Sequence, residues 1–443
     1  MQPLTHRRQP IHTVYGGAHL FRADTASRLG VAALGTLREY GPDPETLAAA
    51  TGMAREAAAA VYPRIVDTLQ REPVEDFRLD FEDGYGHRPD SEEDGHAASA
   101  AREVANGLLQ RTLPPFIGIR IKPLNDELRD RALRTTHRFL AALLEGTRGR
   151  LPDNFVVTLP KITAPSQVTA LVRELAAIET ERRLAPGSLR MELMVETPQS
   201  IFDEHGAAAL PAFVRAGEGR IVAAHFGTYD YTASLGITAA YQHMRHPACD
   251  FARHVMQVAL AGSGVWLSDG ATNVLPVAVH PAGPHAPLTV AQQAENRAAV
   301  HRAWKRHYDD IRHSLTNGYY QGWDLHPAQL VTRYAAVYGF FFESLDAASE
   351  RLRNFIAKAA QATLVGEVFD AAATGQGLLN FFLKALNCGA VGEDAIEAQS
   401  GLTLDELRSG SFLQIVQART ERGQSHLFAN SDTRRGQNGD THS

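Results

Sequence analysis

Short apolar runs alternate with longer stretches of helical spacing over residues 11–327. The apolar runs are bounded by Gly, Pro and charged residues, which is the pattern of buried strands. Eight strand candidates occur, at residues 11–17, 77–81, 116–121, 155–159, 193–195, 221–224, 264–267 and 318–325. Helical spacing occurs at residues 24–40, 45–71, 90–110, 132–144, 166–181, 251–260 and 289–314. This alternation predicts parallel βαβ units, and eight of them favour a closed (β/α)₈ TIM barrel.

An open doubly wound sheet is the alternative architecture for such an alternation. It is less favoured, because no Gly-x-Gly-x-x-Gly follows the first strand candidate. A Walker-type Gly-Lys-Ser/Thr loop is also absent from the sequence. The pattern therefore gives no support for a dinucleotide-binding or P-loop protein.

The strand signals end near residue 327, and the remaining chain has helical spacing. We predict helices at residues 328–345, 347–364, 366–373, 377–386 and 403–421. The resulting domain organisation is a flexible N-terminus (1–10), the barrel (11–327), a helical C-terminal domain (328–421) and a disordered tail (422–443).

The composition is that of an ordinary globular protein, with 44% hydrophobic and 21% charged residues among 443. A formal charge of −6 and the lack of a basic stripe argue against nucleic-acid binding. The two cysteines, Cys249 and Cys388, have no metal-ligand spacing and are expected to be buried apolar residues. No secretory signal or 18-residue apolar run is present, so a cytoplasmic protein without a membrane span is expected.

Two carboxylates follow successive strand candidates in the segment 191–236 (MELMVETPQS, then AAHFGTYDYTASLG). Glu196 precedes Thr-Pro, and Asp230 follows Gly-Thr-Tyr. Carboxylates at neighbouring strand ends can bind one hard cation, which needs few protein ligands. The alternative is that each acid caps the helix that follows it. Because the arrangement occurs twice in succession, the metal interpretation is favoured.

Other charged residues also lie at the predicted carboxyl ends of strands, where TIM-barrel active sites are built. The candidates are Asp80, Glu82, Asp83, Arg120, Lys122, Lys161, Glu196, Asp230, Asp269, Asp324 and His326. Acids alternate with cations, which suits a divalent metal together with an anionic substrate. Arg120 could clamp a carboxylate or stabilise an oxyanion, or it could pair with Glu82. His326 and His225 are expected to be packing residues more often than catalytic ones.

Seven motifs occur in one order: DFEDGYG (80–86), IRIKP (119–123), LPKI (159–162), VETPQSI (195–201), FGTYDYTASLG (226–236), LSDG (267–270) and GWDLHPAQL (322–330). Together they resemble the citrate lyase β-subunit/HpcH–HpaI aldolase superfamily, which includes malyl-CoA lyases and CitE-like proteins. The resemblance covers about residues 70–330. It implies a Mg²⁺-dependent carbon–carbon lyase or aldolase acting through an enolate, with Mn²⁺ as a further metal, and a homo-oligomer.

The resemblance also implies roles for individual residues. Glu196 and Asp230 would be the metal ligands, and Arg120 would clamp the substrate and stabilise the oxyanion. Glu82 and Asp83 would lie beside the metal through water, and Lys161 would have either a catalytic or a structural role. Substrate contacts are expected from the motif residues Thr197, Pro198, Gly227, Thr228 and Tyr229.

The sequence departs from this family near its start. CoA-using relatives carry Arg-Ser and then a strand ending in Pro-Gly, whereas this chain has HTVYGGAHLF at 12–21. A free 2-oxo or hydroxy acid is therefore at least as well supported as an acyl-CoA substrate. Two alternatives stay open: a phosphoryl-transfer enzyme of the phosphoenolpyruvate/pyruvate type, and a non-catalytic metabolite-binding barrel.

Overall fold

The computed structural model describes residues 8–281, 283, 287–364 and 372–421. The described residues form two compact units. One is Gln9–Phe340, and the other contains Arg8 together with the described residues from Phe341 onward. Most of the predicted flexible N-terminus and all of the predicted disordered tail lie outside the described residues.

The first unit is a closed barrel of eight parallel strands in the order β1 to β8, with β8 paired to β1. This confirms the predicted (β/α)₈ fold. The strands are β1 (His12–Gly17), β2 (Asp76–Asp80), β3 (Phe116–Arg120), β4 (Phe155–Leu159), β5 (Arg190–Val195), β6 (Ile221–Phe226), β7 (Trp266–Ala271) and β8 (Gln321–Asp324).

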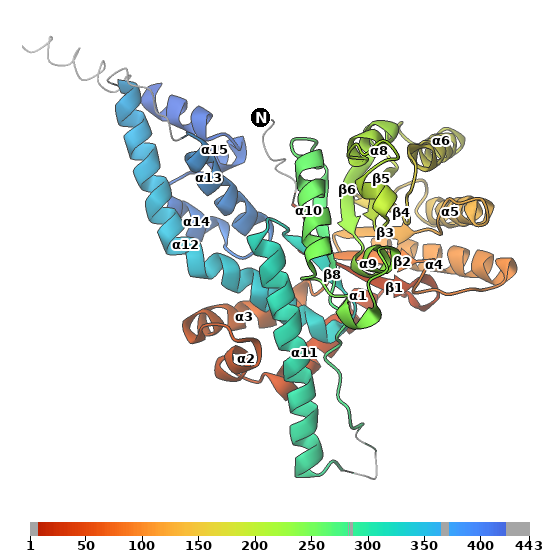
Figure 1. The fold of residues 1–443 in the computed structure, drawn as a ribbon, viewed down its shortest axis with the longest axis horizontal. Helices are drawn as coiled ribbons and strands as arrows, with labels where there is room; N and C mark the ends of the chain where they lie inside the picture. Colours follow the sequence, from red (N-terminus) through yellow and green to blue (C-terminus); the bar gives the residue numbers. More distant parts are fainter. Residues whose placement is uncertain (1–7, 282, 284–286, 365–371, 422–443) are drawn as a thin grey trace, which may run out of the picture. The chain divides into compact units, whose positions relative to one another are not determined.

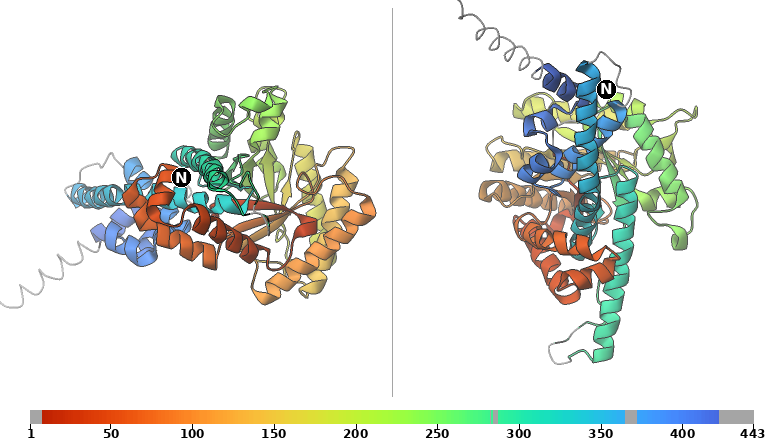
Figure 2. Two further views of the ribbon diagram at one scale, coloured as in Figure 1. Left: turned by 90° about the horizontal axis from the view of Figure 1, so that it is seen from below. Right: turned by 90° about the vertical axis from the view of Figure 1, so that its left-hand side faces the viewer.

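Helices connect successive strands and lie outside the barrel, as α4, α5 and α6 show in Figure 1. The α-helices of this unit are α1 (Thr25–Tyr40), α2 (Pro44–Thr51), α3 (Arg55–Arg71), α4 (Asp90–Gln110), α5 (Arg129–Gly146), α6 (Pro165–Arg182), α7 (Pro198–Ile201), α8 (Leu210–Ala216), α9 (Thr228–Ser234), α10 (Pro247–Leu260), α11 (Val290–Thr316) and the start of α12 (Pro327–Leu364). The long helix α11 packs against α1 and α2, and Figure 2 shows its full length.

Strand side chains alternate between the two faces of the barrel wall. The outward face is aliphatic, with Ile117, Ile119 and Val157 nearly inaccessible to solvent against the helices. The inward face below the mouth is charged, because Arg78 donates to both Glu192 oxygens at 2.9 and 2.6 Å and also pairs with Asp76. Below the mouth, the barrel interior therefore contains a buried ion-pair network instead of the usual aliphatic layers.

The second unit is helical in its described part. It contains the rest of α12, α13 (Ala372–Asn387), α14 (Glu393–Ser400), α15 (Leu404–Ser409) and helical residues at 412–421. The two helices predicted at 328–345 and 347–364 are one continuous helix, because no Gly or Pro interrupts its hydrogen bonds at 345–347. The single helix predicted at 403–421 is wrong, since Gly410, with φ of +66°, ends α15.

Helix α14 was not predicted, and most of the predicted helix at 366–373 lies outside the described residues. Both cysteines are free and buried, as expected. Among the helices in the described part of the chain, none has the length and apolar character needed to cross a membrane. The cytoplasmic location stays a prediction.

Candidate active site at the barrel mouth

The carboxyl ends of β2 to β6 bring six of the predicted residues to one edge of the barrel. They are Glu82, Asp83, Arg120, Lys161, Glu196 and Asp230. A hollow of about 250 Å³ opens beside them, and its lining includes Lys161, Glu196 and Asp230. Carboxylates and cations that follow or end five neighbouring strands therefore converge at this edge.

Arg120, at the last position of β3, is oriented by Asp80 at the end of β2. Its Nε and Nη2 donate to the two Asp80 oxygens at 2.7 and 2.5 Å. Asp80 also accepts the backbone N–H groups of Glu82 and Gly84, at 2.9 and 2.7 Å. The remaining nitrogen, Nη1, lies 3.2 Å from Glu82 Oε2. The main partner of the arginine is thus Asp80, and Nη1 is the part of the guanidinium that faces the other acids.

Lys161 connects the acids of β2 to those of β5 and β6. Its ammonium forms an ion pair with Glu82, and it lies 3.1 Å from Asp83 Oδ1 and 3.9 Å from Asp230 Oδ1. Its backbone has φ of +50°, and its N–H donates to Glu196 Oε1 at 2.8 Å. Lys161 therefore has a left-handed backbone conformation, which is uncommon for a residue other than glycine. In this conformation its backbone N–H and its ammonium group bind different acids.

Glu196 is fully buried, with 1% of its surface exposed, just beyond the end of β5. Burial, reinforced by the neighbouring Asp230 carboxylate, raises the pKa of its carboxyl group to about 8. Gly227, the residue that follows β6, leaves room for this carboxylate because it has no side chain. A Cβ there would lie 2.4 Å from Glu196 Oε2.

Two further acids at the mouth share this behaviour. Burial raises the pKa of Asp230, which faces Glu196 and carries a 42% exposed side chain. Burial also raises the pKa of Glu82 to about 7, opposed by Arg120 and reinforced by Asp83. Glu82 Oε2 is buried and makes no hydrogen bond within the described structure. These acids are held close together without enough positive charge to stabilise all of them as anions.

This donor set fits a divalent cation bound through few protein ligands. Within the described ranges, no three or more His, Cys, Asp or Glu side chains are grouped as a metal cage. Mg²⁺ does not require one, because it retains several waters and uses one or two carboxylates. Glu196 and Asp230 provide two carboxylates, and a cation between them would stabilise both as anions against the burial that raises their pKa values.

One family model matches residues 4–415, nearly the whole chain. The chain belongs to this family, which is described as "Domain of unknown function (DUF6986)". No curated protein matches the sequence.

Solved structures with the same fold include a citrate lyase from Burkholderia xenovorans LB400. It is 18% identical, with a TM-score of 0.53 over 89% of this chain and 96% of that chain. A Haloferax volcanii malate synthase in complex with magnesium and glyoxylate is 15% identical, with a TM-score of 0.46 over 74% and 76% of the two chains. CitE from Mycobacterium tuberculosis in complex with magnesium and pyruvate is 18% identical, with a TM-score of 0.38 over 75% and 91%. The predicted resemblance to citrate lyase-type proteins is confirmed at the level of the fold.

The side chains of the motif residues expected to bind substrate have internal partners in this family member. Thr197 Oγ1 donates to the Ile162 carbonyl at 2.6 Å, and Thr228 Oγ1 lies 3.1 Å from Met244 Sδ. The Tyr229 hydroxyl donates to the Ala271 carbonyl at 2.9 Å. Pro198 is the first residue of α7, and Gly227 precedes α9. Substrate binding by these five residues stays a prediction.

The remaining charged candidates, Lys122, Asp269 and Asp324, each pair with buried residues. Lys122, expected near the mouth, is buried and bonded to Glu93 and to the Phe81 carbonyl, both at 2.7 Å. Asp269 is buried and accepts from Arg253 and Ser314, at 2.9 and 2.5 Å. Asp324 is buried against Arg333, His12 and His307.

The two histidines also have internal partners. His225 Nδ1 accepts from Trp323 Nε1 at 3.1 Å, and His326 Nδ1 accepts from the Ala328 N–H at 3.2 Å. Both bonds are of the kind expected for packing residues.

Two aromatic residues at the mouth were not among the candidates. The Tyr15 ring lies 4.8 Å from the Arg120 guanidinium carbon and 4.3 Å from the Trp323 ring. Each presents an aromatic face to the guanidinium, an arrangement that stabilises a partly desolvated cation. Their positions at the ends of β1 and β8 could have indicated this, because strand ends meet at the barrel mouth.

Proposed function

We propose that this protein is a Mg²⁺- or Mn²⁺-dependent carbon–carbon lyase or aldolase that acts on a small 2-oxo or hydroxy acid through an enolate. The observation that carries the proposal is the pair of facing carboxylates, Glu196 and Asp230, which follow the adjacent strands β5 and β6 of a fold shared with a citrate lyase. When bound, a divalent cation would act as a Lewis acid toward the substrate carbonyl.

Arg120 would supply positive charge where the substrate oxygen becomes negative. Its Nε and Nη2 are bound by Asp80, so Nη1 is the donor that can be directed at the substrate. A donor held in place before reaction needs no reorganisation when charge develops. The aromatic faces of Tyr15 and Trp323 would keep water from one side of the guanidinium.

Glu82 would hold and release a proton at Oε2. Its pKa of about 7 allows both states at neutral pH, which suits a general acid or base. Lys161, bonded to Glu82 and Asp83, would balance the charge that this transfer leaves. A free acid is our preferred substrate over an acyl-CoA, and assembly into a homo-oligomer stays a prediction.

The decisive experiment is calorimetric titration of Mg²⁺ and Mn²⁺ with and without pyruvate, oxaloacetate or acetyl-CoA. Glu196→Gln and Asp230→Asn should lose metal-dependent binding of the acid. Glu204→Gln, at an acid with an 88% exposed side chain, is the matched control and should bind as the wild type does.

Metal binding unchanged in Asp230→Asn would overturn the site assignment. Turnover of the bound acid above that of Glu196→Gln would distinguish an enzyme from a binding protein. Phosphate release from phosphoenolpyruvate, followed by ³¹P NMR, would favour the phosphoryl-transfer alternative instead.

A further inference from the structure

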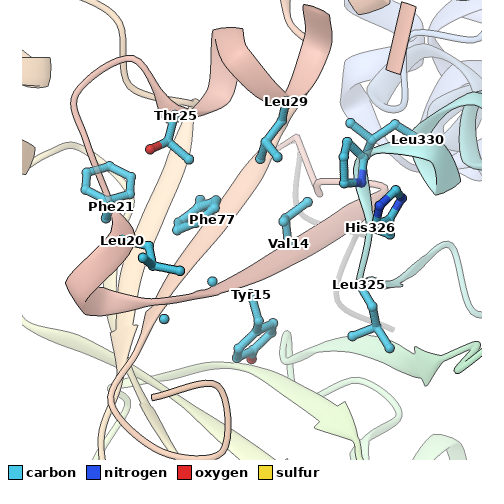
Figure 3. Close-up of a pocket in the computed structure, with 13 residues that line it drawn as sticks. Val14, Tyr15, Leu20, Phe21, Thr25, Leu29, Phe77, Leu325, His326 and Leu330 are labelled. Carbon is cyan, nitrogen blue, oxygen red and sulfur yellow. The ribbon is translucent and has the colours of Figure 1, made fainter. Parts of the chain in front are cut away.

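An apolar cavity of about 190 Å³ lies beside α1, and Figure 3 shows Val14 and Phe77 among its lining side chains. These two residues face away from the barrel interior, opposite to Asp80 and Arg120, so the strand wall separates the cavity from the candidate active site. None of its lining residues, all of which the structure describes, is Lys, Arg, Asp or Glu. A charged ligand group therefore has no partner in this cavity.

On the β6–β7 side of the barrel mouth, two arginines share one buried carboxylate. Arg245 Nε lies 3.0 Å from Asp310 Oδ1, and Arg306 Nε donates to Asp310 Oδ2 at 3.3 Å. Arg245 belongs to the segment between α9 and α10, whereas Arg306 and Asp310 belong to α11. Asp310 also accepts from Thr272, the residue that follows β7, at 2.8 Å. The two arginines therefore lie at the edge of the barrel where the strands end, as the candidate active site does.

Asp310 balances only one of the two positive charges of this arginine pair. Both arginines use Nε for the aspartate, and neither donates a hydrogen bond from Nη1 or Nη2 to a described residue. The side chains of Arg245 and Arg306 are 37% and 34% exposed, so a ligand from solvent can reach these nitrogens. Terminal guanidinium nitrogens are the donors that bind carboxylate and phosphate oxygens in pairs.

Two histidines next to the arginine pair add further N–H groups. The ring centroids of His243 and His246 lie 5.8 Å apart. His243 Nδ1 is buried and makes no hydrogen bond within the described structure. Burial lowers the pKa of the His243 imidazole, as do the positive charges of Arg306 and His246, and Asp310 opposes them. A bound anion would supply the negative charge that these groups lack.

We propose that Arg245, Arg306 and His243 form a binding site for a phosphoryl group, separate from the metal carboxylates. A phosphate monoester carries about two negative charges and three strong acceptor oxygens at neutral pH, so it matches two guanidinium groups better than a carboxylate does. A free phosphate ion, a small phosphorylated metabolite and a nucleotide share this chemistry. The inference goes beyond the proposed function, because no residue of this site belongs to the candidate active site.

The test is calorimetric titration of inorganic phosphate, glycerol 3-phosphate and AMP into the full-length protein, without Mg²⁺ and at constant ionic strength. We expect binding that weakens about tenfold or more in Arg245→Gln and in Arg306→Gln, because each variant loses charge-assisted hydrogen bonds to the phosphate. The compound that binds most tightly identifies the source of the phosphoryl group. Arg297→Gln is the matched control and should bind as the wild type does. Arg297 is exposed on α11 and lies on the face opposite to Arg306, because nine residues make about two and a half turns.

Arg245→Lys and Arg306→Lys serve if loss of a partner of Asp310 unfolds the glutamine variants. Each keeps a positive charge beside Asp310 but replaces the paired donors by one ammonium group, so it should fold and bind phosphate more weakly than the wild type. No binding of any of the three compounds, or binding that is unchanged in the folded arginine variants, would overturn the inference. Asp230→Asn should bind phosphate as the wild type does. Loss of phosphate binding in that variant would place the phosphate at the candidate active site and would also overturn the inference.

Discussion

Asp80 holds Arg120 through two hydrogen bonds, from Nε at 2.7 Å and from Nη2 at 2.5 Å. The two residues are register partners on β2 and β3, so the sheet itself sets their separation. Two parallel N–H to oxygen bonds fix the plane of a guanidinium as well as its position. The direction of Nη1, the nitrogen that Asp80 does not bind, is consequently determined by Asp80.

Asp80→Asn tests this positioning role. The amide can accept at only one oxygen, so the guanidinium loses a charge partner and its fixed plane. We expect kcat/KM for the preferred acid to fall about 10²-fold, as for loss of one oxyanion donor. Mg²⁺ affinity should change little. Arg120→Lys should lose activity similarly, because an ammonium cannot form the paired bonds. Steady-state kinetics measure the activity, and calorimetry measures the Mg²⁺ affinity. Wild-type activity in Asp80→Asn would contradict the positioning role of Asp80.

Gly227→Ala should abolish metal binding without unfolding the barrel. The new methyl group would lie 2.4 Å from Glu196 Oε2 and 2.5 Å from Glu196 Cβ, so the carboxylate must move. We expect destabilisation of about 1–3 kcal/mol, the usual cost of overpacking, together with loss of the calorimetric Mg²⁺ signal. The control is Gly35→Ala in α1, where a Cβ meets nothing within 4 Å. That variant should bind Mg²⁺ normally and be more stable by about 0.5–1 kcal/mol. Normal metal binding in Gly227→Ala would show that Glu196 is not a ligand.

Mg²⁺ affinity should rise with pH between about 6 and 8. The raised pKa values, about 8 for Glu196 and about 7 for Glu82, mean that both carboxyls retain protons at neutral pH. A cation binds only the deprotonated carboxylate, so binding must release protons, and affinity increases until the groups are ionised in the free protein. Each proton released changes the Kd by up to about tenfold per pH unit below the pKa.

Calorimetry in two buffers of different ionisation enthalpy measures the protons released. The number of protons released per bound Mg²⁺ should be close to zero above about pH 9. It should also be smaller in Glu196→Gln than in the wild type. A Kd that is the same at pH 6 and pH 8 would contradict metal binding at these acids.

The barrel could be predicted from the sequence because strands such as β4 (FVVTL) and β6 (IVAAHF) are short apolar runs followed by turn residues. The candidate acids could be predicted because strand ends converge at one edge, whatever the details of packing. The orientation of Arg120 could not, since Asp80 ends β2 and Glu82 follows two residues later, so either could pair with it. The apolar cavity beside α1 joins residues from β1, from α1 and from the segment after β8, more than 300 positions apart in the sequence, and nothing local marks such a cavity.

Arg78→Ala should destabilise the protein by about 3–5 kcal/mol, because it leaves Asp76 and Glu192 buried without their cation. Arg78 is 1% exposed and is an inward residue of β2, so water cannot replace its bonds. The midpoint of urea unfolding, followed by circular dichroism, measures the effect. Arg190→Ala is the control: Arg190 is exposed at the start of β5 and donates to the Gly219 carbonyl, so its loss should cost about 0.5 kcal/mol or less. If both variants unfold at the wild-type urea concentration, the buried network does not support the mouth. If only Arg78→Ala unfolds at a lower urea concentration, the buried network of Arg78, Asp76 and Glu192 stabilises the barrel interior below Arg120 and Glu196.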